Sequence, residues 1–168
     1  RQVAKVPTAV TAAIAPDDAA ARRKLDMDGC AALPGSCFTY SEQGAELLAT
    51  RRVVPTLPPS FYSPAPGATR VFVRRKLARL VLTGDRLHLF SSMHDDVHGF
   101  DVHYEIDCAA DTIVAAEATT SRLPYRGLCD EPQGRVRSMI GQPVDALLRK
   151  RTGPLLGGAL GCAQLFDL

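Results

Sequence analysis

Residues 97–107, VHGFDVHYEID, decide the fold class, because apolar and polar side chains alternate along them. In an extended chain, one side carries His98, Phe100, Val102, Tyr104 and Ile106. The other side carries Asp101, His103, Glu105 and Asp107. Such alternation is typical of a β-strand with one face in the core and the other in solvent, so we predict a strand over residues 98–106.

The residues on either side extend this strand into an antiparallel meander. Before it, an apolar run at 80–82 leads into a tight turn at Gly84-Asp85, and Leu87 and Leu89 then alternate with His88 and Phe90. After it, the turn CAAD at 108–111 leads to a further predicted strand over residues 112–120. Connections this short join antiparallel neighbours.

Helical spacing follows the strands. One predicted helix spans residues 131–140 and stops at Gly141. A second opens at Pro143 and ends in the basic residues 149–151, with Gly153-Pro154 as the break after it. We interpret residues 155–168, LLGGALGCAQLFDL, as a buried helix that packs closely through its glycines. Strands followed by helices, without βαβ alternation, indicate an α+β fold.

The N-terminal part differs in character. It contains a predicted helix over 16–27, a second from Glu42 to Arg52 capped by Ser41, and five prolines between 55 and 67. We expect Phe61 and Tyr62 to fix this Pro-rich arm to the domain rather than to stack on a ligand. The predicted organisation is a helical and Pro-rich N-terminal extension, residues 1–66, ahead of an α+β domain over 67–168.

Composition and charge exclude several classes. With 46% hydrophobic and 23% charged residues, the 168-residue chain is globular, and its net charge of +2 argues against nucleic acid as a partner. Charge is nonetheless segregated, at +1 over 1–60, +5 over 61–84, −7 over 85–132 and +3 over 133–168. We interpret this as charge balance between the faces of a small sheet, with a polarised cleft as the alternative.

Cysteine usage and hydropathy bear on location. The five cysteines are odd in number and irregularly spaced, which favours a reducing compartment, and we expect a cytoplasmic protein. The opening, RQVAKVPTAVTAAIAP, is interrupted by Pro7, Thr8 and Thr11, so we do not interpret it as a signal peptide. No apolar run approaches the roughly 20 residues that span a bilayer, so no membrane association is expected.

The densest polar cluster is MHDDVHGFDVH, residues 93–103, with three of the four histidines and three aspartates. Imidazole and carboxylate groups together supply acid–base pairs or metal ligands. On the predicted strand His98 lies at the edge of the apolar face, where its pKa would be perturbed, as a catalytic pocket requires. A histidine bonded to a backbone carbonyl is the alternative. His94 and Asp95 lie on the preceding loop and can fold over either face.

Two thiols are further candidates. Cys129 ends the loop RLPYRGLC just before a helical segment, where a helix dipole is expected to lower its pKa, and Cys162 follows Gly161. For each, the alternative is a buried structural thiol. The chain has no serine nucleophile elbow, Walker loop, Rossmann glycine motif or H-E-x-x-H, which argues against the families that bear them.

Three segments resemble, in order, the motifs of the bacterial domain-of-unknown-function family numbered 2889. They are residues 97–107, the loop SRLPYRGLC at 121–129 and the C-terminal run from 140 to 168. The resemblance covers about residues 66–168 and implies no established activity. It marks His98, Asp107, Pro124, Tyr125, Cys129, Gly157, Gly158, Gly161, Cys162 and Leu165. Gln164 stands where the family has a histidine, and the stretch before His98 is shorter than the family's.

The resemblance suggests two kinds of site. His98, Cys129 and Cys162 would form a zinc site with its fourth position open to water or substrate. We favour the metal-free alternative, in which no cofactor is bound, His98 is the general base or acid, and Tyr125, Cys129 and Cys162 line the pocket. His94 and Asp95 of the adjacent loop complete this candidate set of catalytic residues.

These residues lead to a functional hypothesis. We expect an enzyme that acts on a small organic metabolite by acid–base rather than redox chemistry, as a lyase, isomerase or hydrolase without a nucleotide cofactor. The alternative is a non-catalytic ligand-binding or subunit-assembly module, and a homo-oligomer is compatible with either. A pocket that encloses His98 would favour the enzyme, whereas a large exposed apolar patch with His98 buried and satisfied would favour the module.

Overall fold

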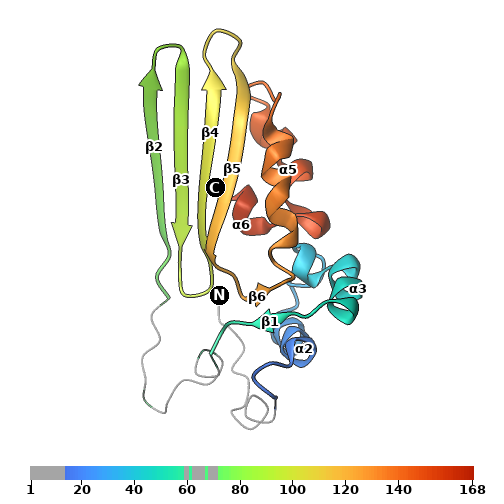
Figure 1. The fold of residues 1–168 in the computed structure, drawn as a ribbon. Helices are drawn as coiled ribbons and strands as arrows, with labels where there is room; N and C mark the ends of the chain where they lie inside the picture. The colour runs from blue at the N-terminus through green and yellow to red at the C-terminus, as the bar shows by residue number, and fades with distance from the viewer. Residues whose placement is uncertain (1–13, 59–60, 62–66, 68–71) are drawn as a thin grey trace.

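A computed structural model describes residues 14–58, 61, 67 and 72–168. Its largest element is a four-stranded antiparallel sheet in which each strand pairs with the next along the chain, as Figure 1 shows. The strands are β2 (Arg75–Thr83), β3 (Arg86–His94), β4 (Gly99–Asp107) and β5 (Thr112–Arg122). The α+β fold and its antiparallel meander are therefore confirmed.

Tight turns set the register of the sheet. Thr83 pairs with Arg86 across a two-residue turn in which Gly84 has a φ of +58°, a left-handed conformation that glycine adopts without strain. In the turn from β4 to β5, Asp107 Oδ1 accepts hydrogen bonds from the backbone N–H groups of Ala109 and Ala110 at 2.9 and 3.1 Å. The alternation predicted for β4 follows from this register, since Phe100, Val102, Tyr104 and Ile106 are buried.

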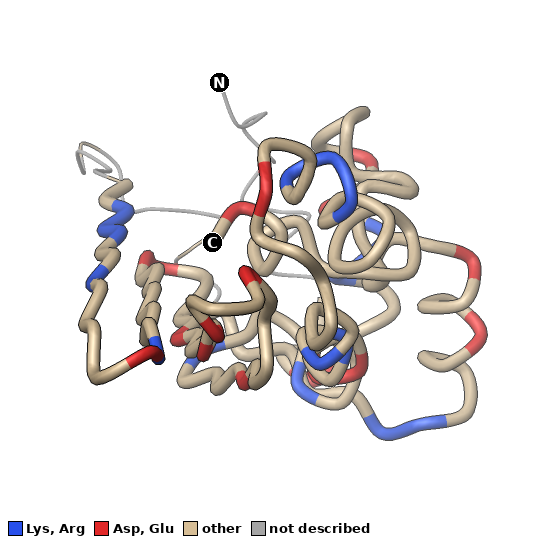
Figure 2. Tube along the Cα trace, turned by 90° about the horizontal axis from the view of Figure 1, so that it is seen from above, with Lys and Arg blue, Asp and Glu red and all other residues tan. Residues whose placement is uncertain are grey.

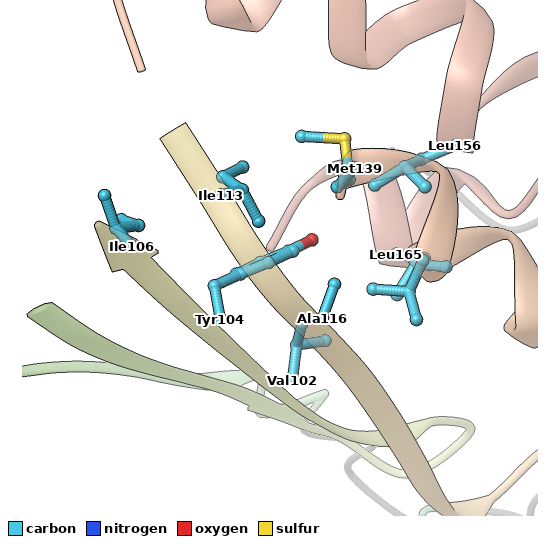
Figure 3. Packing of buried hydrophobic residues seen from close by; sticks show 9 residues of the cluster. Val102, Tyr104, Ile106, Ile113, Ala116, Met139, Leu156 and Leu165 are labelled. Carbon is cyan, nitrogen blue, oxygen red and sulfur yellow. The ribbon is translucent and has the colours of Figure 1, made fainter. Parts of the chain in front are cut away.

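The core lies between one face of the sheet and the C-terminal helical elements. These are η2 (Glu131–Met139), α5 (Leu148–Leu156), η3 (Gly158–Leu160) and α6 (Ala163–Phe166), and they lie on the β5 side of the sheet. Figure 3 shows side chains of β4 and β5 facing Met139, Leu156 and Leu165. The buried cluster comprises Val102, Tyr104, Ile106, Ile113, Ala116, Val136, Met139, Leu156 and Leu165.

The helix predicted from Pro143 begins later than expected. Pro143 forms an isolated bridge with Thr112, and Val144 N donates to the carbonyl of Asp111 at 2.7 Å. This stretch is therefore extended beside the start of β5, and helix α5 begins only at Leu148. The helix runs through Gly153 and includes Pro154, which lies close to its end, so the break predicted there was wrong.

The single buried helix predicted over 155–168 was also wrong, because glycines divide this stretch. Gly158 has a φ of +66°, and Cys162 N returns to the carbonyl of Leu156 at 2.7 Å. The result is the short η3 and α6 with Gly161 between them. The expected close packing through glycine does occur at Gly161, where an added Cβ would lie 2.6 Å from the carbonyl oxygen of Gly157.

The N-terminal part contains α2 (Ala19–Gly29), η1 (Phe38–Tyr40) and α3 (Glu42–Thr50). Helix α2 begins three residues later than predicted, because the Asp18 side chain is its N-cap and accepts from Ala21 N at 2.9 Å. Ser41 caps α3, as predicted, by accepting from Gly44 N at 3.1 Å. The short strand β1 (Val54–Pro55) then pairs with β6 (Tyr125–Arg126) and joins this part to the end of β5.

A buried arginine fixes α2 to the segment that follows it. Arg23 Nε donates to the carbonyl of Thr39 at 2.6 Å, and its Nη2 donates to the carbonyl of Ser41 at 2.9 Å. These bonds place η1 beside α2. Of the Pro-rich arm, Pro59, Tyr62, Pro64 and Pro66 lie outside the described residues, as does the opening segment 1–13, so their predicted roles stay predictions.

We predict that Gly161→Ala destabilises the protein by about 2 kcal/mol or more, because the new Cβ would overlap the backbone carbonyl of Leu156. Urea unfolding monitored by circular dichroism measures the change. Gly134→Ala is the matched control, since nothing lies within 4 Å of a Cβ at that position. Equal stability of the two variants would show that the Gly161 approach is not close.

Candidate functional site

A pocket of about 450 Å³ lies where the N-terminal helices meet the end of the sheet and the C-terminal helices. This volume is in the range of small-molecule sites. Its wall is mostly apolar, with polar groups from Asp26, Thr39, His98 and Gln164. Residues of both predicted parts, 1–66 and 67–168, form the wall, while the domain boundary between them stays a prediction.

His98 lies at the wall of this pocket, directly before β4, which begins one residue later than predicted. Its side chain is 19% exposed, and its ring lies 5.9 Å from the ring of Phe100, between centroids. Burial lowers its pKa, Asp95 opposes this shift and Arg74 adds to it, so the imidazole is neutral at neutral pH. Among the described residues, no backbone carbonyl accepts a hydrogen bond from the ring, so the predicted alternative of a carbonyl-bonded histidine is not observed.

The buried Asp95 carboxylate contacts His98 on the side away from the pocket. Its Oδ1 accepts from Val97 N at 2.7 Å and from His98 N at 2.6 Å, and its Oδ2 accepts from Arg74 Nε at 2.8 Å. Arg122 Nη1 donates to the Asp95 carbonyl. Burial alone would raise the pKa of Asp95, but the two backbone N–H groups and Arg74 outweigh it and hold that pKa below its usual value. Asp95 is thus a fixed anion.

The anion lies close to the imidazole. Asp95 Oδ1 is 3.5 Å from His98 Nδ1, longer than a normal hydrogen bond, and within the described part of the chain this buried nitrogen has no hydrogen-bond partner. A contact of this length is compatible with a hydrogen bond that shortens when the ring becomes charged. Asp95 and His98 therefore form a candidate carboxylate–imidazole pair.

A second polar group lies on the α2 side of the pocket. The Asp26 carboxylate accepts from Tyr40 Oη at 2.9 Å and from Tyr125 Oη. Burial and the nearby Asp26 raise the pKa of Tyr40 above its usual value, so it stays protonated. Tyr125 is buried behind Asp26 rather than at the wall. Sequence reasoning missed Asp26 and Tyr40, because no local pattern links them to Tyr125.

Four of the five cysteines, Cys30, Cys37, Cys129 and Cys162, line the pocket. Cys129 Sγ lies 3.0 Å from Thr39 Oγ1. Burial raises the pKa of the Cys129 thiol to about 12 and also raises the pKa of Cys162. This is opposite to the direction predicted for Cys129, because desolvation outweighs the neighbouring polar groups. Both thiols are therefore protonated at neutral pH.

The structure brings together some of the predicted site residues and not others. His98, Cys129 and Cys162 share the wall of one pocket, with Asp95 behind His98 and Tyr125 behind Asp26. His94 is absent from the described wall. Its Nε2 lies 3.1 Å from Asp101 Oδ1, on the face of the sheet opposite the core.

The described residues contain neither a cluster of metal-ligating side chains nor a helix that could span a membrane. Among the described residues, no group of three or more histidine, cysteine or acidic side chains is arranged to hold a metal ion. The zinc hypothesis for His98, Cys129 and Cys162 thus gains no support from their arrangement and stays a hypothesis. None of the described helices is both long enough and apolar enough to cross a bilayer.

The fold and the pocket define a small α+β protein in which a histidine and several cysteines face one mostly apolar cavity. The chain belongs to the family DUF2889, described as a protein of unknown function, whose family model matches residues 85–168. The match confirms the resemblance and includes His98, Cys129 and Cys162, but not the α2 side of the pocket. No curated protein and no solved structure matched the chain.

We predict that Asp95→Asn destabilises the protein by about 1.5–3 kcal/mol, because the buried side chain loses its charge-assisted hydrogen bonds with Arg74. Asp96→Asn is the matched control, since Asp96 is the exposed neighbour and makes no ion pair with a described residue. Chemical denaturation at neutral pH measures both changes. A loss equal to that of the control would mean that the Arg74 contact contributes little.

We predict that iodoacetamide at neutral pH modifies Cys30 and Cys108 much faster than Cys129, because the first two are exposed and the thiol of Cys129 is buried and protonated. Peptide mass spectrometry after timed quenching measures the three rates. In denaturant the difference should disappear. Rapid modification of native Cys129 would show a reactive thiolate instead.

Proposed function

We propose that this protein is an enzyme that transforms a small organic metabolite by acid–base chemistry, with His98 as the proton-transferring group. The observation that carries the proposal is a neutral, mostly buried imidazole at the wall of a pocket of about 450 Å³. A histidine kept neutral at physiological pH is suited to accept a proton. Lyase, isomerase and hydrolase reactions all use such a step.

The Asp95–His98 pair gives each nitrogen of the ring a role. Nδ1 faces Asp95 at 3.5 Å, which leaves Nε2 to accept a proton from the substrate. The resulting imidazolium would be stabilised by Asp95, whose position Arg74 fixes through two contacts of 2.7 and 2.8 Å. Asp95 thereby acts as a positioning residue that orients the ring and offsets its charge, without itself taking the proton.

The rest of the wall binds and orients the substrate in this proposal. Tyr40 and Asp26 supply hydrogen-bonding groups on the α2 side, and Gln164 supplies an amide. Cys129 and Cys162 contribute apolar surface rather than a nucleophile, because burial raises both of their pKa values. Five free cysteines are compatible with a cytoplasmic location, which is part of the proposal.

A non-catalytic module is the second candidate, and one observation favours it. Strand β2 exposes a row of large apolar side chains, which is typical of an assembly surface. The ring of His98, however, has no hydrogen-bond partner among the described residues at Nδ1 and lines a pocket, unlike the satisfied core histidine that a module would require. The enzyme is therefore the better-supported candidate.

We predict that His98→Gln lowers turnover about 10²- to 10⁴-fold, with His94→Gln as the matched control outside the described pocket wall. Wild type and both variants are incubated with a metabolite extract, and consumed compounds are identified by mass spectrometry. For the substrate found, kcat/KM should decrease at acidic pH with a midpoint below 6.5, since burial lowers the pKa of His98 from its usual value and the protonated ring cannot act as the base. Unchanged turnover in His98→Gln would disprove the catalytic assignment, and retention of a metabolite without conversion would favour the module.

A further inference from the structure

Strand β2 is a long, exposed edge of the sheet. All nine of its residues are exposed, and no described strand pairs with its outer side. Leu80 and Leu82 are 62% and 65% exposed, so most of each leucine is in contact with solvent. Figure 2 shows blue Lys and Arg positions along this outermost strand, on the side of the molecule away from the helices. Edges of this kind are templates for pairing with another strand.

The apolar residues of β2 extend the core face of the sheet. In the register of the strands, Leu80 lies beside Leu89 of β3, which lies beside the buried Tyr104 of β4. Leu82, Leu87 and Ile106 form the next row in the same way. The helical layer lies on the β5 side, so the core face continues beyond the helices that cover it.

The backbone of the same residues faces the free edge. In a hairpin closed by a two-residue turn, the closing pair, here Thr83 and Arg86, is the hydrogen-bonded one, and bonding alternates along the strand. Leu82, Leu80 and Ala78 therefore direct their N–H and C=O groups outward. The uncovered apolar side chains and the unpaired backbone groups belong to one set of residues.

We propose that β2 pairs antiparallel with β2 of a second copy of this chain, about a two-fold axis at Leu80. In this register Leu80 faces the partner's Leu80, and the small Ala78 faces the partner's Leu82. Both pairs lie on the core side, so the sheet and its apolar face continue from one subunit into the other. On the opposite side, Arg79 faces the partner's Val81.

Charge favours the register with its axis at Leu80 over the register one residue earlier. Lys76 is already paired with Asp167 at 2.5 Å and Arg74 with Asp95 at 2.7 Å, which leaves Arg75 and Arg79 as the charges of the strand. A two-fold axis one residue earlier would place Arg79 opposite its own copy, which is unfavourable. The axis at Leu80 avoids this and brings Arg75 next to the Gly84-Asp85 turn of the other subunit, where the charges are opposite. By symmetry, this pair of opposite charges occurs at both ends of the paired strands.

The test changes one charge at one position. Val81→Glu places a carboxylate opposite the partner's Arg79 twice in the dimer, and Val81→Lys places a like charge there. We expect Val81→Glu to lower the dimer Kd about twofold to thirtyfold and Val81→Lys to raise it by a similar factor, both effects being reduced by salt. Sedimentation equilibrium of the full chain measures the Kd values, and circular dichroism checks that each variant is folded.

Two further variants define the surface. Leu80→Lys, at the axis, should give a monomer, whereas Leu147→Lys, at an exposed leucine outside β2, should leave the dimer unchanged. A wild-type protein that is monomeric at its highest soluble concentration would overturn the proposal. So would a dimer whose Kd is the same in Val81→Glu, Val81→Lys and Leu80→Lys, since the contact would then lie elsewhere.

Discussion

The buried carboxylate of Asp95 is the contact on which the candidate site depends. It accepts hydrogen bonds from the backbone N–H groups of Val97 and His98 and binds Arg74, and these contacts stabilise the turn between β3 and β4. That turn places His98 at the pocket wall, with Nδ1 directed to the same carboxylate. The buried carboxylate thus sets the position of the imidazole, while desolvation lowers the pKa of the ring and outweighs the opposing effect of the Asp95 charge.

The sequence predicted those parts of the fold that depend on local chemistry. Alternation at 98–106 and the Gly84 turn are properties of short segments, and both appear as predicted. The C-terminal helices were predicted less well, because the bridge of Pro143 to Thr112 and the return of Cys162 to Leu156 are tertiary contacts that override helical spacing. In the site, His98 could be found from its strand. Asp26 and Tyr40 could not, since Tyr125 is 99 residues away from Asp26.

Burial determines the protonation states of the thiols and the imidazole in the candidate site. A cysteine before a helical segment is expected to have a lowered pKa, yet the pKa of Cys129 is raised, because the wall around it excludes water. The sequence shows which groups can ionise, but the fold decides how much solvent each retains. The same desolvation acts in opposite directions on acid and base, which leaves protonated thiols and a neutral imidazole in one cavity.

The hydrogen bond from Phe38 N to the carbonyl of Gly161, 2.8 Å long, connects the two sides of the pocket. Its ends are more than a hundred residues apart in the chain, so loop closure is costly until the strands between them have folded. During synthesis the β2–β3 hairpin can form early from local contacts alone. The cavity, in contrast, is lined by residues from Leu25 to Gln164, so its wall cannot be complete before the last of them has left the ribosome.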